Sequence, residues 1–189
     1  MSVDFDFEVI LRTMKRAAGA IRDAEIPFML GGGLAVWARG GPKTEHDVDF
    51  FVKPDDAERA QQALVARGFE AERPPEGWLL KAWDGNVLVD LIYEPRGGPI
   101  DDEWFERADE LDVYAVTMSV ASLDDVVVTK LLALSEQNLD YSSALEIARA
   151  VREQLDWDAI RARCAGAPYA EGFLFLAEAL DIAPARTIR

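Results

Sequence analysis

The chain has 189 residues, half of them hydrophobic, and a formal net charge of −15. This length is typical of one domain and buries enough apolar surface to fold without covalent staples. The single cysteine, Cys164, excludes an intramolecular disulfide and predicts a reducing, cytoplasmic setting with a buried thiol. No apolar run reaches the roughly 20 residues of a membrane span, and the acidic start is unlike a signal peptide.

The acidity is concentrated in the middle of the chain. Residues 41–140 hold 23 acidic and nine basic residues, whereas residues 1–40 are neutral and residues 141–189 carry a charge of −1. A strongly anionic surface disfavours nonspecific binding to nucleic acid. Local basic surface therefore belongs to the two ends, and the sequence offers two groups for it: Arg12, Lys15, Arg16 and Arg22, and Arg149, Arg152, Arg161 and Arg163. A basic stripe is usually only a solvated helix face.

The first half of the chain alternates helices and strands. Apolar residues at helical spacing predict a helix over residues 4–24. A short apolar strand over residues 28–30 then runs into three glycines, and a helix over residues 34–39 follows. Residues 47–53 alternate polar and apolar side chains as a strand does, and residues 54–56 open the next helix.

The second half begins with a hairpin and ends in helices. Strands over residues 78–83 and 87–93 flank Asp84-Gly85-Asn86, a strong hairpin signal. A short helix over residues 103–110 and a last strand over residues 113–116 follow. The remaining sequence predicts helices alone, at about residues 122–135, 141–153, 157–164 and 170–180.

These elements predict an α+β fold. We expect a single domain over residues 1–189, in which a mixed sheet of about five strands with flanking helices occupies residues 1–120. Residues 121–189 form a helical C-terminal part packed on that sheet.

Two aspartates on one predicted strand point to a cation. Asp47 and Asp49 are two residues apart, so both carboxylates leave the same face of the sheet. They repel each other by about 1–4 kcal/mol, depending on how wet the site is. A hard divalent cation, Mg²⁺ or Mn²⁺, removes that repulsion. Taken alone, such a pair is more often the polar face of a strand.

Asp90 strengthens the metal interpretation, because it interrupts the apolar run of residues 87–92. An unpaired buried carboxylate costs several kcal/mol, so a positive group should meet it. Adjacent strands would place Asp90 beside Asp47 and Asp49, and three such carboxylates can hold the metals of in-line phosphoryl chemistry. The structural alternative is a salt bridge from Asp90 to Lys81 across the hairpin.

The glycines supply an anion site. A strand, three glycines and a helix start present free backbone N–H groups to an anion, although glycine also serves tight turns. The glycine turn ends one strand and the aspartate pair begins the next. We therefore expect the turn to hold phosphates and the aspartates to hold the metal that bridges them.

The order LGGGLA, GGPKTEHDVDFFV and VLVDLI resembles the nucleotidyltransferase superfamily related to DNA polymerase beta. SLDDVVVTKLLAL is similar to the helix that follows the last strand in its small bacterial branch, which contains AbiEii-type toxins and aminoglycoside nucleotidyltransferases. The resemblance spans roughly residues 26–140. It implies transfer of a nucleoside monophosphate from an NTP, with ATP binding among the options, to an acceptor hydroxyl with Mg²⁺ or Mn²⁺.

The resemblance also implies roles for single residues. Gly32 and Gly33 match the glycine pair that contacts the nucleotide phosphates. Lys130 matches a lysine on the following helix that faces those phosphates, with a snorkelling or ion-paired lysine as the alternative. Lys43 stands where many members carry arginine, and it is assigned to nucleotide binding with them.

The carboxylates match the family's metal site in the same way. Asp47 and Asp49 match its metal-binding pair, and Asp90 matches its third carboxylate, a metal ligand or the base that deprotonates the acceptor. All three are therefore assigned to catalysis and to the metal. The only histidine, His46, precedes Asp47, and strand alternation turns it away from the aspartate side.

The acceptor is where the sequence signals conflict. We expect tRNA as the acceptor, because the AbiEii-type resemblance favours a toxin that modifies the 3′ end of tRNA. A cognate antitoxin would be its partner, and the two arginine-rich groups would form a basic rim. The acidic middle of the chain instead suits a cationic small molecule such as an aminoglycoside. A non-catalytic nucleotide-binding regulatory protein is the third alternative, against which the complete set of carboxylates counts.

Overall fold

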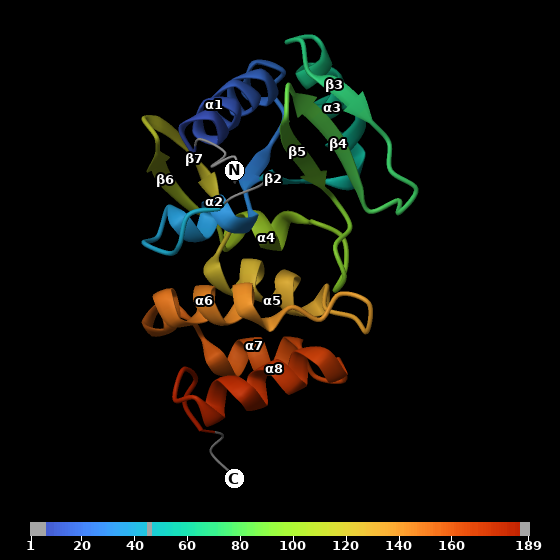
Figure 1. The fold of residues 1–189 in the computed structure, drawn as a ribbon. Helices are drawn as coiled ribbons and strands as arrows, with labels where there is room; N and C mark the ends of the chain where they lie inside the picture. The colour runs from blue at the N-terminus through green and yellow to red at the C-terminus, as the bar shows by residue number, and fades with distance from the viewer. Residues whose placement is uncertain (1–6, 45–46, 186–189) are drawn as a thin grey trace, which may run out of the picture.

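The computed structural model describes residues 7–44 and 47–185. Figure 1 shows a mixed β-sheet with helices above and below it. Seven strands lie in the order β3-β4-β5-β2-β1-β7-β6. Their bounds are β1 Phe28–Leu30, β2 Asp47–Val52, β3 Glu70–Glu72, β4 Leu79–Asp84, β5 Val87–Ile92, β6 Asp109–Val113 and β7 Val116–Val120.

The centre of the sheet is the parallel pair β2–β5. Its register sets Asp49 opposite Asp90. β1 is antiparallel to β2 and parallel to β7, while β4 and β5 form the predicted antiparallel hairpin. The strand interiors are apolar, and Phe50, Phe51 and Leu91 are fully buried. This apolar centre fixes the register, because a one-residue slip would move every side chain to the other face.

Two helices cover one face of the sheet. α1 (Phe7–Asp23) and α3 (Ala57–Val65), the latter preceded by the 3₁₀ turn η1 (Pro54–Asp56), pack there through alanines and aliphatic side chains. Asp84 of β4 accepts hydrogen bonds from Thr13 and Arg16 of α1, which places α1 on the Asp84 face. The predicted helix at residues 4–24 is confirmed from residue 7 onward, and residues 4–6 lie outside the described part.

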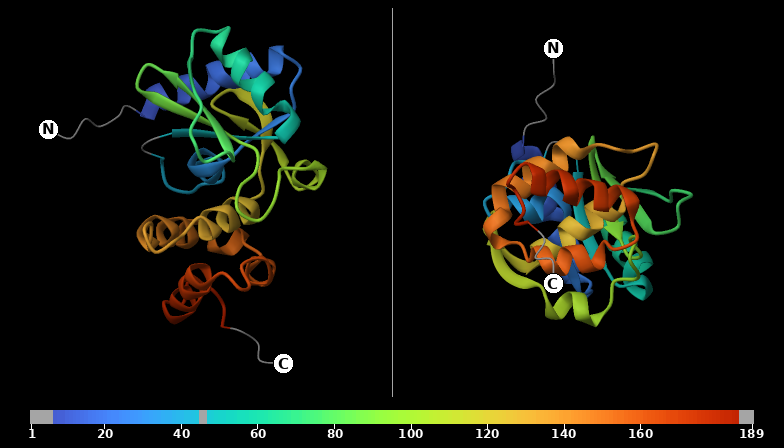
Figure 2. Two further views of the ribbon diagram at one scale, coloured as in Figure 1. Left: turned by 90° about the vertical axis from the view of Figure 1, so that its right-hand side faces the viewer. Right: turned by 90° about the horizontal axis from the view of Figure 1, so that it is seen from below.

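The remaining helices lie on the other side of the sheet. Figure 2 shows them as a stack that leads away from the strands toward the C-terminus. The order along the chain is α2 Gly32–Trp37, α4 Asp102–Glu106, α5 Leu123–Leu132, α6 Tyr141–Val151, the 3₁₀ turn η2 Arg152–Gln154, α7 Trp157–Arg163 and α8 Pro168–Ala179. The predicted C-terminal helices are thus confirmed, with Ser122 as the N-cap of α5.

One buried carboxylate joins the first helices of this stack. Asp125 of α5 is fully buried and accepts hydrogen bonds from Ser122 and from the Arg107 guanidinium that follows α4. Arg163 of α7 is ion-paired to the same carboxylate at 2.7 Å. Both guanidinium groups also lie over the Trp104 ring, at 5.7 and 6.0 Å from its centroid. The cluster links α4, α5 and α7.

The prediction of five strands was wrong by two. Residues 113–116 were expected to be a strand, but Tyr114 and Ala115 form the turn between β6 and β7. Both turn residues have positive φ, 48° and 59°, a conformation that their sequence does not signal. The exposed edge strand β3 was also missed. None of the helices in the described part of the chain has the length and apolar composition that crossing a membrane requires.

Candidate active site

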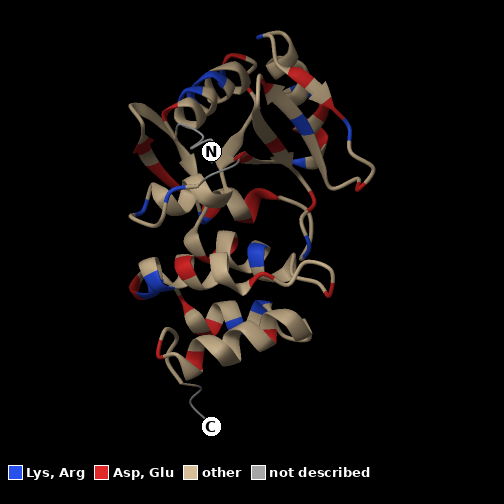
Figure 3. Cartoon of the chain, in the orientation of Figure 1, with Lys and Arg blue, Asp and Glu red and all other residues tan. Residues whose placement is uncertain are grey.

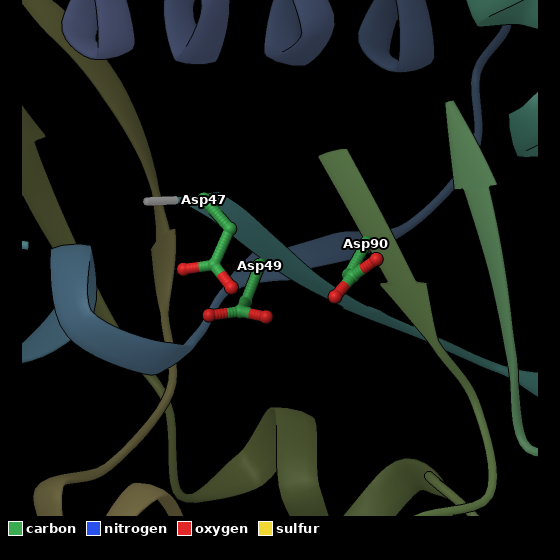
Figure 4. A group of neighbouring side chains, drawn as sticks. All are labelled: Asp47, Asp49 and Asp90. Atoms are coloured by element: carbon green, nitrogen blue, oxygen red, sulfur yellow. The ribbon is translucent and has the colours of Figure 1, made fainter. Parts of the chain in front are cut away.

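Three aspartates gather on the sheet face opposite α1. Asp47 and Asp49 project from β2 and Asp90 from the neighbouring β5, all toward the same space (Figure 4). Each offers a carboxylate oxygen, and these oxygens lie within 4.8 Å of one another. The expectation that adjacent strands bring the three carboxylates together is therefore confirmed. We refer to Asp47, Asp49 and Asp90 as the triad.

Two carboxylates of the triad, Asp49 and Asp90, hold their protons more tightly than an aspartate in water. Burial raises the pKa of Asp49 well above its usual value, and the charges of Asp47 and Asp90 raise it further. Lys130 of α5 acts in the opposite direction on the pKa of Asp49. Burial also raises the pKa of Asp90 to about 6, against the opposing effect of Lys81. A cation in this space would reduce the electrostatic repulsion between these carboxylates.

One oxygen of the triad is buried without a hydrogen-bond donor among the described residues. Asp90 Oδ1 is buried, and nothing in the described residues donates a hydrogen bond to it. Lys81 lies opposite Asp90 in the β4–β5 register, but the described residues contain no ion pair between the two within 4 Å. The alternative of a structural Asp90–Lys81 salt bridge is thus not what is found. A buried acceptor without a donor fits a group that is completed by a metal or a substrate.

The glycine turn is built against the triad. The N–H of Gly31 donates to the carbonyl of Asp49 at 2.8 Å. Gly32 has a φ of +50°, and a Cβ on it would lie 1.7 Å from Asp49 Oδ2. A Cβ on Gly33 would lie 2.7 Å from the Cβ of Thr44. Only glycine fits at these two positions, because the backbone passes directly over neighbouring side chains.

The position of the glycines differs from the expectation in one respect. The predicted helix began at residue 34, but α2 begins at Gly32 with Gly31 as its N-cap. The glycines therefore form the start of the helix rather than a loop before it. Thr44 was not among the predicted site residues, although a Cβ on Gly33 would collide with its side chain, which puts Thr44 beside this turn.

The predicted nucleotide-binding lysines separate in the structure. Lys130 is half-buried on α5, close enough to Asp49 for its charge to act on that carboxyl group. The ammonium of Lys43 instead lies over the Phe7 ring, 5.3 Å from its centroid, at the start of α1. The structure thus brings Lys130 to the triad and not Lys43. His46 falls outside the described residues.

The donor set of the triad suits a hard cation. Three carboxylates supply only oxygen, the ligand type that Mg²⁺ and Mn²⁺ prefer over nitrogen or sulfur. The mutual repulsion and the unpartnered Asp90 Oδ1 are both satisfied by positive charge. The residues present therefore fit a divalent metal, without distinguishing one such metal from another.

Comparison with known proteins agrees with this geometry. Residues 8–179 match a family described as "uncharacterised nucleotidyltransferase". The fold is similar to that of ANT(2″)-Ia, solved in complex with adenylyl-2″-tobramycin, with a TM-score of 0.55, 14% identity and coverage of 90% of this chain and 98% of that one. A search of curated proteins finds no match.

Two further solved structures share the fold. JHP933 from Helicobacter pylori has a TM-score of 0.55 at 12% identity, over 96% of this chain and 81% of its own. A nucleotidyltransferase from Thermotoga maritima, TM1012, has a TM-score of 0.52 at 12% identity, over 64% of this chain and 82% of its own. At such identities these likenesses concern the fold alone.

Proposed function

The chain belongs to this family of nucleotidyltransferases, and we propose that it transfers a nucleoside monophosphate from an NTP to an acceptor hydroxyl at the triad. The hydroxyl attacks the α-phosphate, and pyrophosphate leaves. The observation that carries the proposal is the convergence of three carboxylates with one oxygen, Asp90 Oδ1, left unpartnered and buried. A structural cluster would instead satisfy each oxygen with protein donors.

In this scheme the three carboxylates bind the metal, and one of them is also the base. Asp47 and Asp49, side by side on β2, are the metal ligands, and Asp90 completes the set from β5. A divalent cation bound there would neutralise charge on the phosphates and on the three carboxylates. Asp90 is also the base: an acceptor hydroxyl beside its carboxylate donates a hydrogen bond to it and passes its proton to it. In the metal-free protein the pKa of Asp90 is raised to about 6 by burial, so this carboxyl group can hold a proton close to neutral pH.

The nucleotide phosphates belong between the glycine turn and α5. Gly32 and Gly33 keep this side of the site free of side chains, and Lys130 brings a positive charge from the other side. We propose that these three residues position the triphosphate. Since phosphoryl transfer depends mainly on positioning and charge neutralisation, this arrangement accounts for most of the expected acceleration.

For the acceptor we favour a cationic small molecule over tRNA. The basic residues of α1, seen as blue segments of this helix in Figure 3, lie across the sheet from the triad, because α1 packs on the Asp84 face. Of the second arginine group, Arg161 is paired with Asp158 and Glu178, and Arg163 with Asp125. These ion pairs and the position of α1, among the described residues, weigh against the basic rim that an RNA acceptor would need beside the triad. The fold shared with ANT(2″)-Ia adds support for an aminoglycoside-type acceptor.

A labelled-nucleotide assay tests both levels of the proposal. The protein is incubated with each labelled NTP and Mg²⁺, together with total tRNA or an aminoglycoside panel. We expect label on a small molecule, and none with Asp90→Asn. Label on tRNA alone would contradict the small-molecule acceptor and support the toxin interpretation, in which a cognate antitoxin is a partner. No transfer to any acceptor, combined with tight NTP binding, would favour the non-catalytic regulatory alternative.

A further inference from the structure

The sheet face that carries the triad continues past Asp90 onto β4 and β3. Strand register places side chains there in two rows: Glu72–Lys81–Asp90–Asp49 and Glu70–Trp83–Leu88–Asp47. We call the residues beyond the triad the platform: Glu70, Glu72, Lys81, Trp83 and Leu88. All five are exposed or half-buried. The helices that pack closely on β3, β4 and β5, α1 and α3, lie on the opposite face.

Trp83 is held in place at the centre of the platform. Its Nε1 donates a hydrogen bond of 2.7 Å to the Glu72 carboxylate, which fixes the orientation of the indole. The side chain is half-buried, and within the described ranges no other ring or cation stacks on it. A fixed, partly exposed indole offers a flat surface for a ligand ring and attracts positive charge to its face.

The charge of the platform favours a cation. Glu70 and Glu72 are exposed carboxylates at its outer edge. Its single positive residue, Lys81, stands between Glu72 and Asp90 in the same row, so carboxylates flank its charge on both sides. Together with the triad, the whole face is therefore negative and attracts a positively charged ligand.

The dimensions match a ligand that also reaches the triad. Glu72 and Asp90 are two strands apart, which corresponds to about 10 Å. Two linked six-membered rings span such a distance. A ring stacked on Trp83 would thus place a substituent near the Asp90 carboxylate of the triad.

We propose that the platform is the acceptor site and that the acceptor is a cationic, polyhydroxylated ring compound. One ring stacks on Trp83, ammonium groups bind Glu70 and Glu72, and a hydroxyl reaches Asp90. This assignment rests on the proposed nucleotidyl transfer, because it makes the platform the second substrate site of that reaction.

Steady-state kinetics with the acceptor found in the transfer assay test the assignment. Trp83→Ala and Glu72→Gln should each raise the KM for the acceptor at least tenfold and leave the KM for NTP within twofold. Trp83→Phe, which keeps a ring, should retain most of the affinity. Trp78→Ala is the matched control, since Trp78 is 39% exposed and precedes β4 outside the platform. An unchanged acceptor KM in Trp83→Ala and Glu72→Gln, with transfer intact, would overturn the assignment.

Equilibrium binding separates this assignment from the proposed function. The probes are the trimer of glucosamine, which is cationic, and the trimer of N-acetylglucosamine, which has the same rings without the charge. The metal-free protein should bind the cationic trimer at least fivefold more tightly, and Trp83→Ala should lose that binding. If the protein shows this binding but transfers no nucleotide, the platform is supported as a ligand site and the proposed nucleotidyl transfer is contradicted. Equal binding of both trimers, or binding of the cationic trimer by Trp83→Ala as tightly as by the wild type, would contradict the assignment of the platform as the acceptor site.

Discussion

The backbone of Gly32 lies so close to the carboxylate of Asp49 that a Cβ at Gly32 would stand 1.7 Å from Asp49 Oδ2. The glycine turn and the metal-ligand candidate are therefore one packed unit, although they come from different elements. A side chain at this position would have to displace Asp49 or move the start of α2. The two halves of the site depend on each other through this contact.

Gly32→Ala tests that dependence. The positive φ alone costs about 1–2 kcal/mol in unfolding free energy. Displacement of Asp49 should in addition lower kcat for transfer at least a hundredfold. Gly40→Ala is the control, since Gly40 also has a positive φ, +88°, but nothing lies within 4 Å of its added Cβ. We expect a larger stability loss in Gly32→Ala than in Gly40→Ala, with activity lost only in Gly32→Ala. Full activity of Gly32→Ala would contradict the contact's importance.

Asp49→Asn should abolish transfer and stabilise the metal-free protein. The amide removes a charge that burial and two neighbouring carboxylates disfavour. We expect an increase of about 1 kcal/mol in unfolding free energy without divalent cations. Mg²⁺ should raise the melting temperature of the wild type and not that of the variant. Asp55→Asn, at an exposed position of η1, should change neither quantity. Mg²⁺-dependent transfer at the wild-type rate would refute the metal assignment.

The stability of the metal-free protein should fall as pH rises from about 4 to about 6. Burial raises the pKa of Asp90 to about 6 in the folded protein, from an ordinary value of 3.8. Within this window the folded state holds a proton that the unfolded state has lost. The contribution is complete below pH 4 and is lost above pH 6, a change of about 1–2 kcal/mol for a half-buried group.

Chemical denaturation at several pH values, without divalent cations, measures this slope. Asp90→Asn should reduce it, and the double variant with Asp49→Asn should flatten it further, since the pKa of Asp49 is raised as well. An unchanged slope in the double variant would show that the triad is not its source.

Lys130→Ala should raise the KM for NTP about tenfold, with little change in the melting temperature. Lys130 is half-buried beside Asp49 and is the positive charge that α5 brings to the triad. Lys15→Ala, at an exposed position of α1 across the sheet, should leave the KM for NTP unchanged. A large drop in melting temperature with normal kinetics would instead assign Lys130 a structural role.

Asp125→Asn should destabilise the protein strongly. The change leaves Arg107 and Arg163 without the carboxylate that both contact. Because the arginines are partly exposed, we expect a loss of about 2–4 kcal/mol, or about 5–15 °C in melting temperature. Asp158→Asn removes a carboxylate that is 97% exposed and pairs with Arg161, so it should cost less than about 0.5 kcal/mol. Equal effects of the two changes would contradict the importance of burial.

The triad could be predicted from the sequence because two local patterns indicated it. Strand alternation put Asp47 and Asp49 on one face, and Asp90 was the only charge in an apolar run. Both signals are local, and a parallel pairing of buried strands then brings the carboxylates together. The family assignment and the nucleotidyltransferase activity were also accessible from these motifs.

The missed strands and the observed position of Lys43 have physical reasons. β6 contains Asp109, Glu110 and Asp112, residues that disfavour strands, and it is held by its pairing with β7. The turn at Tyr114 and Ala115 lacks the asparagine or glycine that usually marks positive φ. The ammonium of Lys43 lies over the Phe7 ring, and no local sequence pattern encodes this tertiary contact. The platform was missed because register, not sequence spacing, aligns Trp83 and Glu72 with the triad.

The parallel pairing of β2 with β5 also has a consequence for folding kinetics. Asp49 and Asp90 are neighbours in space but 41 positions apart in the chain. A ligand that needs both carboxylates binds only after this long-range pairing has formed, and the pairing of parallel strands far apart in the chain is intrinsically slow. Mg²⁺ should therefore slow the unfolding rate of the protein and leave its folding rate unchanged. Stopped-flow measurement with and without Mg²⁺ would place closure of the β2–β5 ladder on the folding coordinate.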